Sequence, residues 1–140
     1  MGKFFSVKEL TNSNTAKQKN INNTPSKEVE ANIELLITKV LDTIREAFNK
    51  PIYINSGYRC SALNKAVKGA PDSSHLYGEA ADLDSRGNNL ELWNVIMKLY
   101  KEGKIEFDQC INEKPIGVIP KWIHIAYKKK GNRNMVFTIK

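Results

Sequence analysis

Residues 73–82 read Ser-Ser-His-Leu-Tyr-Gly-Glu-Ala-Ala-Asp and contain one of the chain's two histidines. His75 lies on a loop with Gly78, and Asp82 follows seven residues after the histidine, in a short apolar strand predicted over 80–83. Glycine lets a loop turn sharply. The stretch therefore predicts a loop and a strand that can fold an imidazole and a carboxylate onto one point.

The second histidine, His124, lies in the apolar stretch 122–127, Trp-Ile-His-Ile-Ala-Tyr, which predicts a strand. An imidazole inside an apolar strand needs a partner to offset its desolvation, and a metal is one such partner. Two neutral imidazoles and one carboxylate, with the fourth position left to water, form the ligand set of a catalytic zinc site. A strand histidine is also commonly a hydrogen-bonded core residue, so spacing alone leaves both interpretations open.

The rest of the chain predicts an α+β fold with an antiparallel sheet packed against helices. Residues 1–27 are rich in Asn, Thr and Lys and predict an irregular arm laid over the core. Apolar residues recur at spacings of three and four from Val29 to Phe48, which predicts a helix that Ser26 caps and Pro51 ends. Strands that come mostly after helices favour an antiparallel sheet. The remaining predicted elements are helices at about 61–68 and 90–100 and strands at 52–54, 105–112 and 135–139.

Length and composition indicate one domain over 1–140. The chain is 41% hydrophobic and 26% charged. Both fractions lie near the averages for soluble domains, which argues against a disordered chain or a fibrous fold. No apolar run approaches the roughly 20 residues that span a bilayer, so we expect no membrane partner. Cys60 and Cys110 lie fifty residues apart without metal-type spacing and are expected to be free thiols. We expect a monomer.

The net charge of +7 permits an anionic partner but does not choose among nucleic acid, anionic lipid and the polyanionic bacterial wall. The visible basic cluster, 128–130 with Arg133, is expected to be a solvated hairpin turn. Aromatic and basic residues do not interleave as in nucleic-acid-binding motifs, so no nucleic-acid partner is expected.

Several motifs follow one another along the chain: Ser56-Gly57-Tyr58-Arg59, Leu63-Asn64, Ser73-x-His75-x-x-Gly78-x-Ala80-x-Asp82 and Trp122-x-His124. In this order they resemble the zinc D-Ala-D-Ala carboxypeptidase family. The stretches Glu9-Leu10-Thr11-x-Ser13-x-Thr15-Ala16 and Ile44-Arg45-Glu46 also resemble its small phage and bacterial members. That family includes vancomycin-resistance D,D-dipeptidases and phage L-alanyl-D-glutamate endolysins, and it shares its fold with the Hedgehog signalling domain. The resemblance implies a Hedgehog/DD-peptidase-like fold with Zn2+ as cofactor.

The same resemblance assigns roles to individual residues. It makes His75, Asp82 and His124 the zinc ligands. Arg59 matches the arginine that binds substrate and stabilises charge on the attacked carbonyl, a role that suits an always protonated guanidinium. Ser73 matches a serine that bonds substrate or orders the loop, and Trp122 is expected either to pack or to form a wall of the substrate pocket.

The general base departs from the family pattern. Relatives often carry Glu or Asp three residues before the second histidine, where this chain has Lys121. A lysine is not a base at neutral pH unless its pKa falls by several units. Glu113, at the end of a strand predicted to pair with that of His124, is the expected base, and Asp108 is the second choice.

We therefore expect a zinc peptidase that hydrolyses an amide bond in the stem peptides of peptidoglycan, as a carboxypeptidase or an endopeptidase. The alternative is a catalytically silent zinc-binding module that recognises cell wall or a protein partner. The N-terminus has no apolar core of a signal peptide. A phage protein released through a holin or carried in the virion, or a bacterial protein, would reconcile this with action on the wall.

Overall fold

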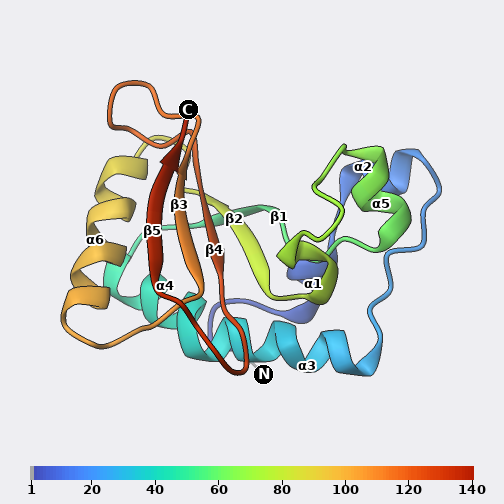
Figure 1. The fold of residues 1–140 in the computed structure, drawn as a ribbon, viewed down its shortest axis with the longest axis horizontal. Helices are drawn as coiled ribbons and strands as arrows, with labels where there is room; N and C mark the ends of the chain where they lie inside the picture. The colour runs from blue at the N-terminus through green and yellow to red at the C-terminus, as the bar shows by residue number, and fades with distance from the viewer. Residues whose placement is uncertain (1) are drawn as a thin grey trace.

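The computed structural model describes residues 2–140 and has a five-stranded sheet between α6 on one side and α2 and α5 on the other (Figure 1). The strands are β1 (Tyr53–Ser56), β2 (Ala80–Asp84), β3 (Gln109–Glu113), β4 (Trp122–Ala126) and β5 (Met135–Ile139). Their order across the sheet is β1-β2-β4-β3-β5. The predicted α+β class is confirmed. All pairs are antiparallel except β3 with β5, which is parallel.

The predicted long helix forms as one continuous helical stretch. It consists of α3 (Lys27–Leu36), a π-helical turn η1 (Ile37–Leu41) and α4 (Asp42–Phe48). Ser26 caps it, because its side chain accepts a hydrogen bond from the Val29 N–H. The helix ends at Phe48, ahead of Pro51, because Asn49 takes the left-handed conformation that terminates helices.

The helices α5 (Ser61–Ala66) and α6 (Asn89–Lys101) begin and end close to the predicted residues. The loop predicted around His75 instead contains a short 3-10 helix, η2 (Ser74–Tyr77). The arm predicted to be irregular over 1–27 contains two one-turn helices, α1 (Val7–Thr11) and α2 (Asn14–Gln18). Ser6 and Ser13 cap them through their side chains, which explains why so polar a segment still turns. Within 2–140, no helix combines the length and the hydropathy that crossing a bilayer demands.

The register of the sheet separates its two faces. Asp82 pairs with His124, and His124 also pairs with Ile111, so these side chains share one face. The neighbouring residues of each strand point to the opposite face, which is apolar and packs against the helices. The fully buried residues of this face are Ala81, Leu83, Cys110, Ile123 and Ile125. A one-residue slip would exchange the two faces. The hydrophobic core therefore fixes the register that places the polar residues together.

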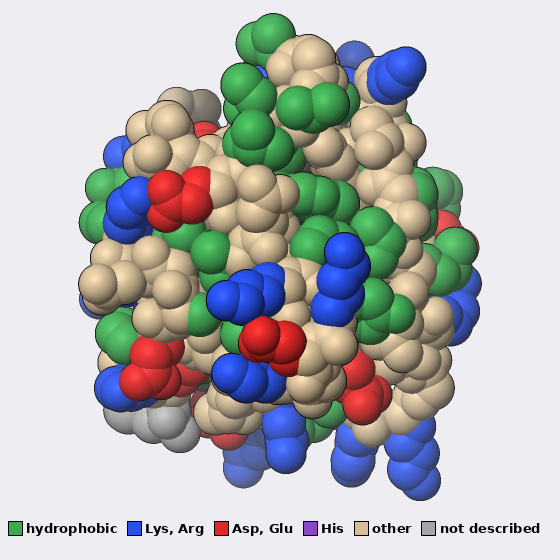
Figure 2. All heavy atoms as spheres, turned by 90° about the vertical axis from the view of Figure 1, so that its left-hand side faces the viewer, with side chains coloured by type: hydrophobic (Ala, Val, Ile, Leu, Met, Phe, Trp, Pro, Cys, Tyr) green, Lys and Arg blue, Asp and Glu red, His purple; other side chains and the backbone are tan. Residues whose placement is uncertain are grey.

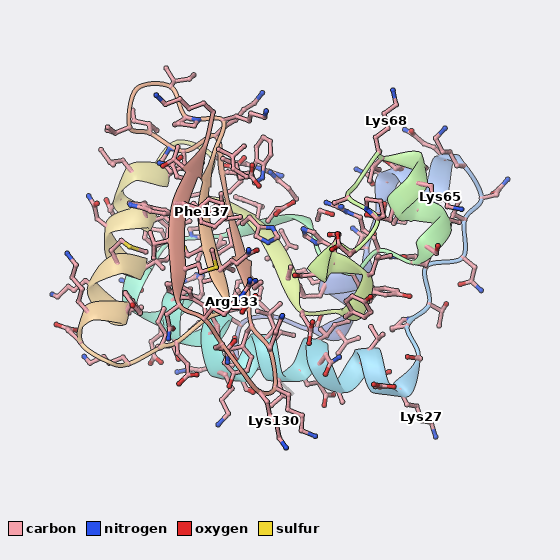
Figure 3. All side chains as sticks on the ribbon, in the orientation of Figure 1. Lys27, Lys65, Lys68, Lys130, Arg133 and Phe137 are labelled. Atoms are coloured by element: carbon pink, nitrogen blue, oxygen red, sulfur yellow. The ribbon has the colours of Figure 1, made fainter. Side chains whose placement is uncertain are left out.

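The predicted strand over 105–112 begins later, at Gln109. The chain before it is bonded to the turn that precedes β5: the Phe107 N–H donates to Asn134, and Arg133 donates to the buried Asp108. The side chain of Arg133 makes two of these bonds, of 2.9 Å and 2.8 Å, and its backbone N–H a third, of 3.2 Å, so the basic turn is anchored as well as solvated. Figure 3 shows Arg133 on this turn and Lys130 extending from its tip.

Candidate active site

His75 lies on a short 3-10 turn that a serine begins and a glycine ends. The Ser73 side chain accepts a hydrogen bond from the His75 N–H and begins η2, and Gly78 ends it with φ of +71°. A Cβ at Gly78 would also lie 2.8 Å from the Val29 carbonyl oxygen of α3. Two features therefore require glycine at position 78: the positive φ and the close packing against α3.

The His75 ring has a defined tautomer. Its Nδ1 lies 2.6 Å from the Gly57 carbonyl oxygen, which can only accept, so Nδ1 carries the proton. The lone pair is then on Nε2. This atom is buried and makes no hydrogen bond within residues 2–140, although Asp82 Oδ1 lies 3.3 Å away. A buried nitrogen lone pair without a hydrogen-bond partner is a donor suited to a Lewis acid.

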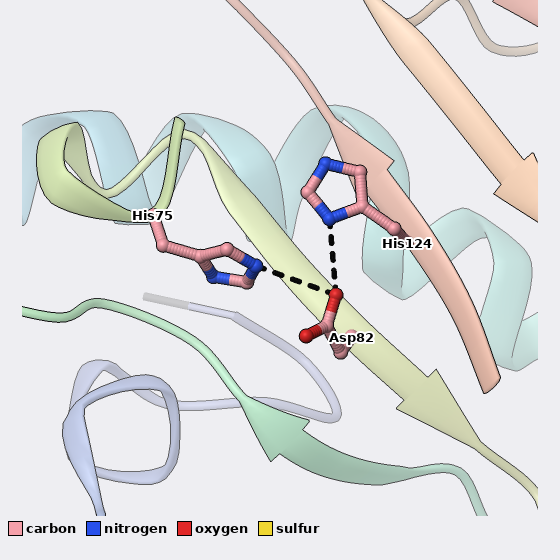
Figure 4. Close-up of side chains that lie close together, drawn as sticks. All are labelled: His75, Asp82 and His124. Carbon is pink, nitrogen blue, oxygen red and sulfur yellow. Dashed lines mark hydrogen bonds and ion pairs between the residues drawn. The ribbon is translucent and has the colours of Figure 1, made fainter. Parts of the chain in front are cut away.

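Asp82 and His124 complete a triad with His75 (Figure 4). His124 Nδ1 lies 3.0 Å from Asp82 Oδ1, and one donor atom from each of the three residues lies within 4.8 Å of the others. Burial raises the pKa of Asp82, but the hydrogen bond from His124 and the His75 ring beside the carboxylate outweigh it and hold that pKa well below its usual range. The carboxylate is therefore ionised and ready to bind a cation.

The donor set fits zinc. Neutral imidazole nitrogens and a carboxylate oxygen are ordinary zinc donors, and three protein ligands leave one position open, as catalytic sites do. The Gly57 carbonyl orients the His75 ring in the way that outer-shell acceptors orient zinc ligands. The predicted ligands His75, Asp82 and His124 are thus brought together by the fold.

Arg59 is fixed beside the triad. Its Nε donates to Ser56 Oγ at 2.9 Å and its Nη1 to Asn64 Oδ1 at 3.1 Å. Its Nη2 lies 3.6 Å from Asp82 Oδ2, and its backbone N–H donates to the His75 carbonyl. A guanidinium held at three points presents a rigid positive charge next to the metal ligands.

One cavity of about 360 Å³ collects the predicted site residues. The residues that line it include Arg59, Ser73, His75, Asp82, Glu113, Trp122 and His124. Glu113 pairs with Trp122, two residues along each strand from the pair of Ile111 and His124. Because side chains two residues apart share a face, Glu113 and Trp122 lie on the face that carries the triad. Burial raises the pKa of Glu113. Trp122 forms a wall of the cavity, whereas Tyr58 packs against the core.

The structure distinguishes the two candidate bases, Glu113 and Asp108, and shows where Lys121 lies. Lys121 is exposed and does not belong to the described lining of the cavity. Asp108 is fully buried in its ion pair with Arg133, and it too lies outside the described lining. Glu113 is thus the carboxylate that faces the triad without being part of it.

Three residues at the site were not given a role by sequence reasoning. Asn64 is buried and bridges Arg59 to the Ala70 carbonyl. Gly69 allows this, since a Cβ there would lie 2.1 Å from Asn64 Oδ1. Lys68 lines the cavity, and Figure 3 shows it beside Lys65 on the α5 side of the molecule. The Leu63-Asn64 motif was the signal for Asn64, whereas nothing in the sequence singled out Lys68.

The opposite side of the molecule has different chemistry. Figure 2 looks at the side on which α6 lies, and no histidine among the described residues is visible there. Lysine and arginine side chains project along its lower edge and hydrophobic side chains gather at its upper edge. Both histidines of the chain instead line the metal cavity, together with Val67 and Lys68, which follow α5.

Gly57→Ala is expected to damage both the fold and the metal site. An added Cβ would lie 2.2 Å from the Leu10 carbonyl oxygen, and this is backbone that does not yield easily. We expect a loss of about 1–3 kcal/mol in the free energy of unfolding. The Gly57 carbonyl holds His75, so zinc affinity should fall on the order of 10- to 100-fold. Urea unfolding and competition with a chromogenic chelator measure the two effects.

Gly103→Ala is the matched control. Gly103 has φ of +72° and no neighbour within 4 Å of an added Cβ, so the variant should lose stability through backbone strain alone. Its zinc affinity should stay at the wild-type value. Equal zinc affinity in Gly57→Ala and wild type would show that the Gly57 carbonyl does not position His75.

Comparison with known proteins agrees with this geometry. The model of a family described as Peptidase M15 matches residues 3–126. A curated relative, the zinc D-Ala-D-Ala carboxypeptidase of Streptomyces albus G, is 48% identical over 44 residues. That match covers 31% of this chain and 17% of the relative, so the chain matches only a small part of that protein's length.

Proposed function

The chain belongs to the peptidase M15 family, and on this premise we propose that it hydrolyses an amide bond in the stem peptides of peptidoglycan. The family and the buried triad of His75, Asp82 and His124 make it a metallopeptidase with zinc as its cofactor. The cell-wall substrate is supported by the similarity to a D-Ala-D-Ala carboxypeptidase. The net charge of +7 suits a polyanionic wall.

The observation that carries the proposal is the meeting of three chemical functions in one cavity. The triad holds the metal, Arg59 supplies a fixed cation, and Glu113 supplies a carboxylate outside the ligand set. A structural metal site has its coordination closed by four protein ligands and needs neither of the other two groups. The arrangement is that of a hydrolytic centre.

The chain's own residues divide the work of hydrolysis. Bound zinc supplies a Lewis acid that polarises the peptide carbonyl and acidifies water. Arg59 braces the negative charge that develops on the attacked carbonyl oxygen. Glu113 takes the proton of the attacking water and later returns it to the leaving amine, so that bond cleavage needs no free proton. Asn64 and Ser56 contribute indirectly, because their hydrogen bonds hold the Arg59 guanidinium in place.

Digestion of purified peptidoglycan tests the proposal. Zinc-loaded protein should release fragments whose masses identify the cleaved bond, and a chelator should stop the release until zinc is restored. Loss of a single terminal alanine would identify a carboxypeptidase, and separation of peptide from peptide or from glycan an endopeptidase. Intact peptidoglycan after prolonged incubation with the zinc-loaded chain would favour a silent zinc-binding module instead.

Arg59→Lys is expected to keep zinc and lose activity. A compact ammonium cannot bond Ser56 and Asn64 and face the substrate at once, as the planar guanidinium does. Loss of a preorganised charge of this kind costs about 10²- to 10³-fold in kcat. Arg45→Lys on α4, outside the described lining of the cavity, is the control and should be fully active. Unchanged cleavage by Arg59→Lys would remove this residue from the mechanism.

A further inference from the structure

A second cavity of about 400 Å³ adjoins the one at the metal. The N-terminal arm forms one wall with residues 12–15, and β1 and α5 form the others. Arg59 and Val67 line both cavities, so the guanidinium stands at the boundary between them. A substrate bound at the triad can therefore continue past Arg59 into this space.

The wall made by the arm is held in place by hydrogen bonds to the Arg59 loop. Asn23 Nδ2 donates to the carbonyls of Thr11 and Tyr58, at 3.0 Å and 2.9 Å, and Asn23 Oδ1 accepts from the Cys60 N–H at 2.8 Å. The Tyr58 N–H donates to the Leu10 carbonyl at 2.7 Å. The cavity is preorganised, because a ligand entering it does not have to order its wall.

The chemistry of this cavity differs from that at the metal. The amide side chains of Asn12, Asn14 and Asn55 are exposed at it, and the hydroxyl of Thr15 is half-buried. Its apolar lining comes from Ile54, Leu63 and Val67. Among the described residues that line it, Arg59 alone is charged. Such a surface recognises uncharged groups that donate and accept hydrogen bonds, such as amides and hydroxyls.

We propose, on the basis of the function proposed above, that this second cavity binds an uncharged part of peptidoglycan beyond the cleaved bond, through its amide and hydroxyl groups. A substrate confined to the residues around the reacting bond would not reach Asn14 and Asn55. The protein thus discriminates in favour of longer substrates. The shared chemistry has two sources in the wall, the backbone amides of the stem peptide and the acetamido and hydroxyl groups of the sugars.

The double variant Asn14→Ala/Asn55→Ala tests the proposal by kinetics. For a muropeptide that carries both the disaccharide and the full stem peptide, kcat/KM should fall roughly tenfold, as expected from losing two hydrogen bonds between neutral groups. For the shortest peptide that the wild type cleaves, kcat/KM should not change. Asn94→Ala, an exposed asparagine of α6, is the matched control and should behave as wild type with both substrates. An equal fall with both substrates, or no fall with either, would overturn the proposal.

A binding measurement separates this proposal from the proposed function. The full chain, freed of metal with a chelator so that nothing is cleaved, is titrated with free stem peptide and with the disaccharide alone while the side-chain amide signals of Asn14 and Asn55 are followed by NMR. Shifts with the peptide assign the cavity to the peptide backbone, and shifts with the disaccharide assign it to sugar. If neither ligand moves these signals, the second cavity is not a subsite, even if zinc-dependent cleavage is found. If the signals move but nothing is ever cleaved, the subsite stands and the proposed hydrolysis fails.

Discussion

His124→Ala is expected to leave the purified chain without zinc while its helices remain folded. The substitution removes one of three protein ligands, and two ligands do not hold zinc against buffer and water. A chain of 140 residues with an extended apolar core does not depend on a metal to fold. Metal analysis should fall from about one zinc per chain to none detectable, and the circular dichroism of the helices should change little.

Lys121→Ala is the control for this experiment. Lys121 precedes the same strand but is exposed and outside the described lining of the metal cavity, so the variant should keep full zinc content. A His124→Ala protein that is wholly unfolded would indicate a structural metal. One that keeps stoichiometric zinc would remove His124 from the ligand set.

Glu113→Gln is expected to abolish most catalysis without touching the metal. Glutamine keeps the size and hydrogen-bonding reach of the side chain but has no basicity, and loss of a general base costs about 10²- to 10⁴-fold in rate. Because burial raises the pKa of Glu113, the wild type should lose activity on the acid side as this carboxylate is protonated. The rate and its pH profile are measured at a zinc content confirmed for both proteins.

Asp108→Asn is the matched carboxylate control. It breaks the buried ion pair with Arg133, so it should lower the free energy of unfolding while leaving zinc content and the rate per folded molecule unchanged. Full activity of Glu113→Gln would show that Glu113 is not the base. If the wild type is inert on every wall substrate and Lys121→Glu gains hydrolysis, the chain is a silent zinc-binding module.

The parts of the site that local pattern predicts are those on regular strands. Asp82 and His124 each occupy a polar position in an apolar strand, and a sheet that buries the alternating residues must place them on one face. The role of Arg59 and the assignment of His75, Asp82 and His124 as zinc ligands came from the resemblance to the family, not from local pattern. The register that puts Glu113 beside Trp122 was not readable, because both strands are short and a slip of two residues leaves every side chain on the same face.

The rest of the site depends on contacts between segments far apart in the chain. Asn23 reaches across to Tyr58 and Cys60, and no local pattern predicts that partnership. The parallel pairing of β5 with β3 follows from the anchoring of the preceding turn by Arg133 on Asp108. The His75 tautomer is set by a backbone carbonyl, that of Gly57, which carries no signature in the sequence.

The three ligands differ in the kind of element that holds them, and this determines how the metal can leave. Asp82 and His124 lie on β2 and β4, interior strands whose amides exchange with solvent only when a large part of the sheet opens. His75 lies on a single 3-10 turn that can open locally. Release of zinc should therefore begin at His75 and proceed at the opening rate of that turn. Denaturant too dilute to unfold the sheet should then speed the dissociation of zinc, while the amide protons of β2 and β4 remain protected.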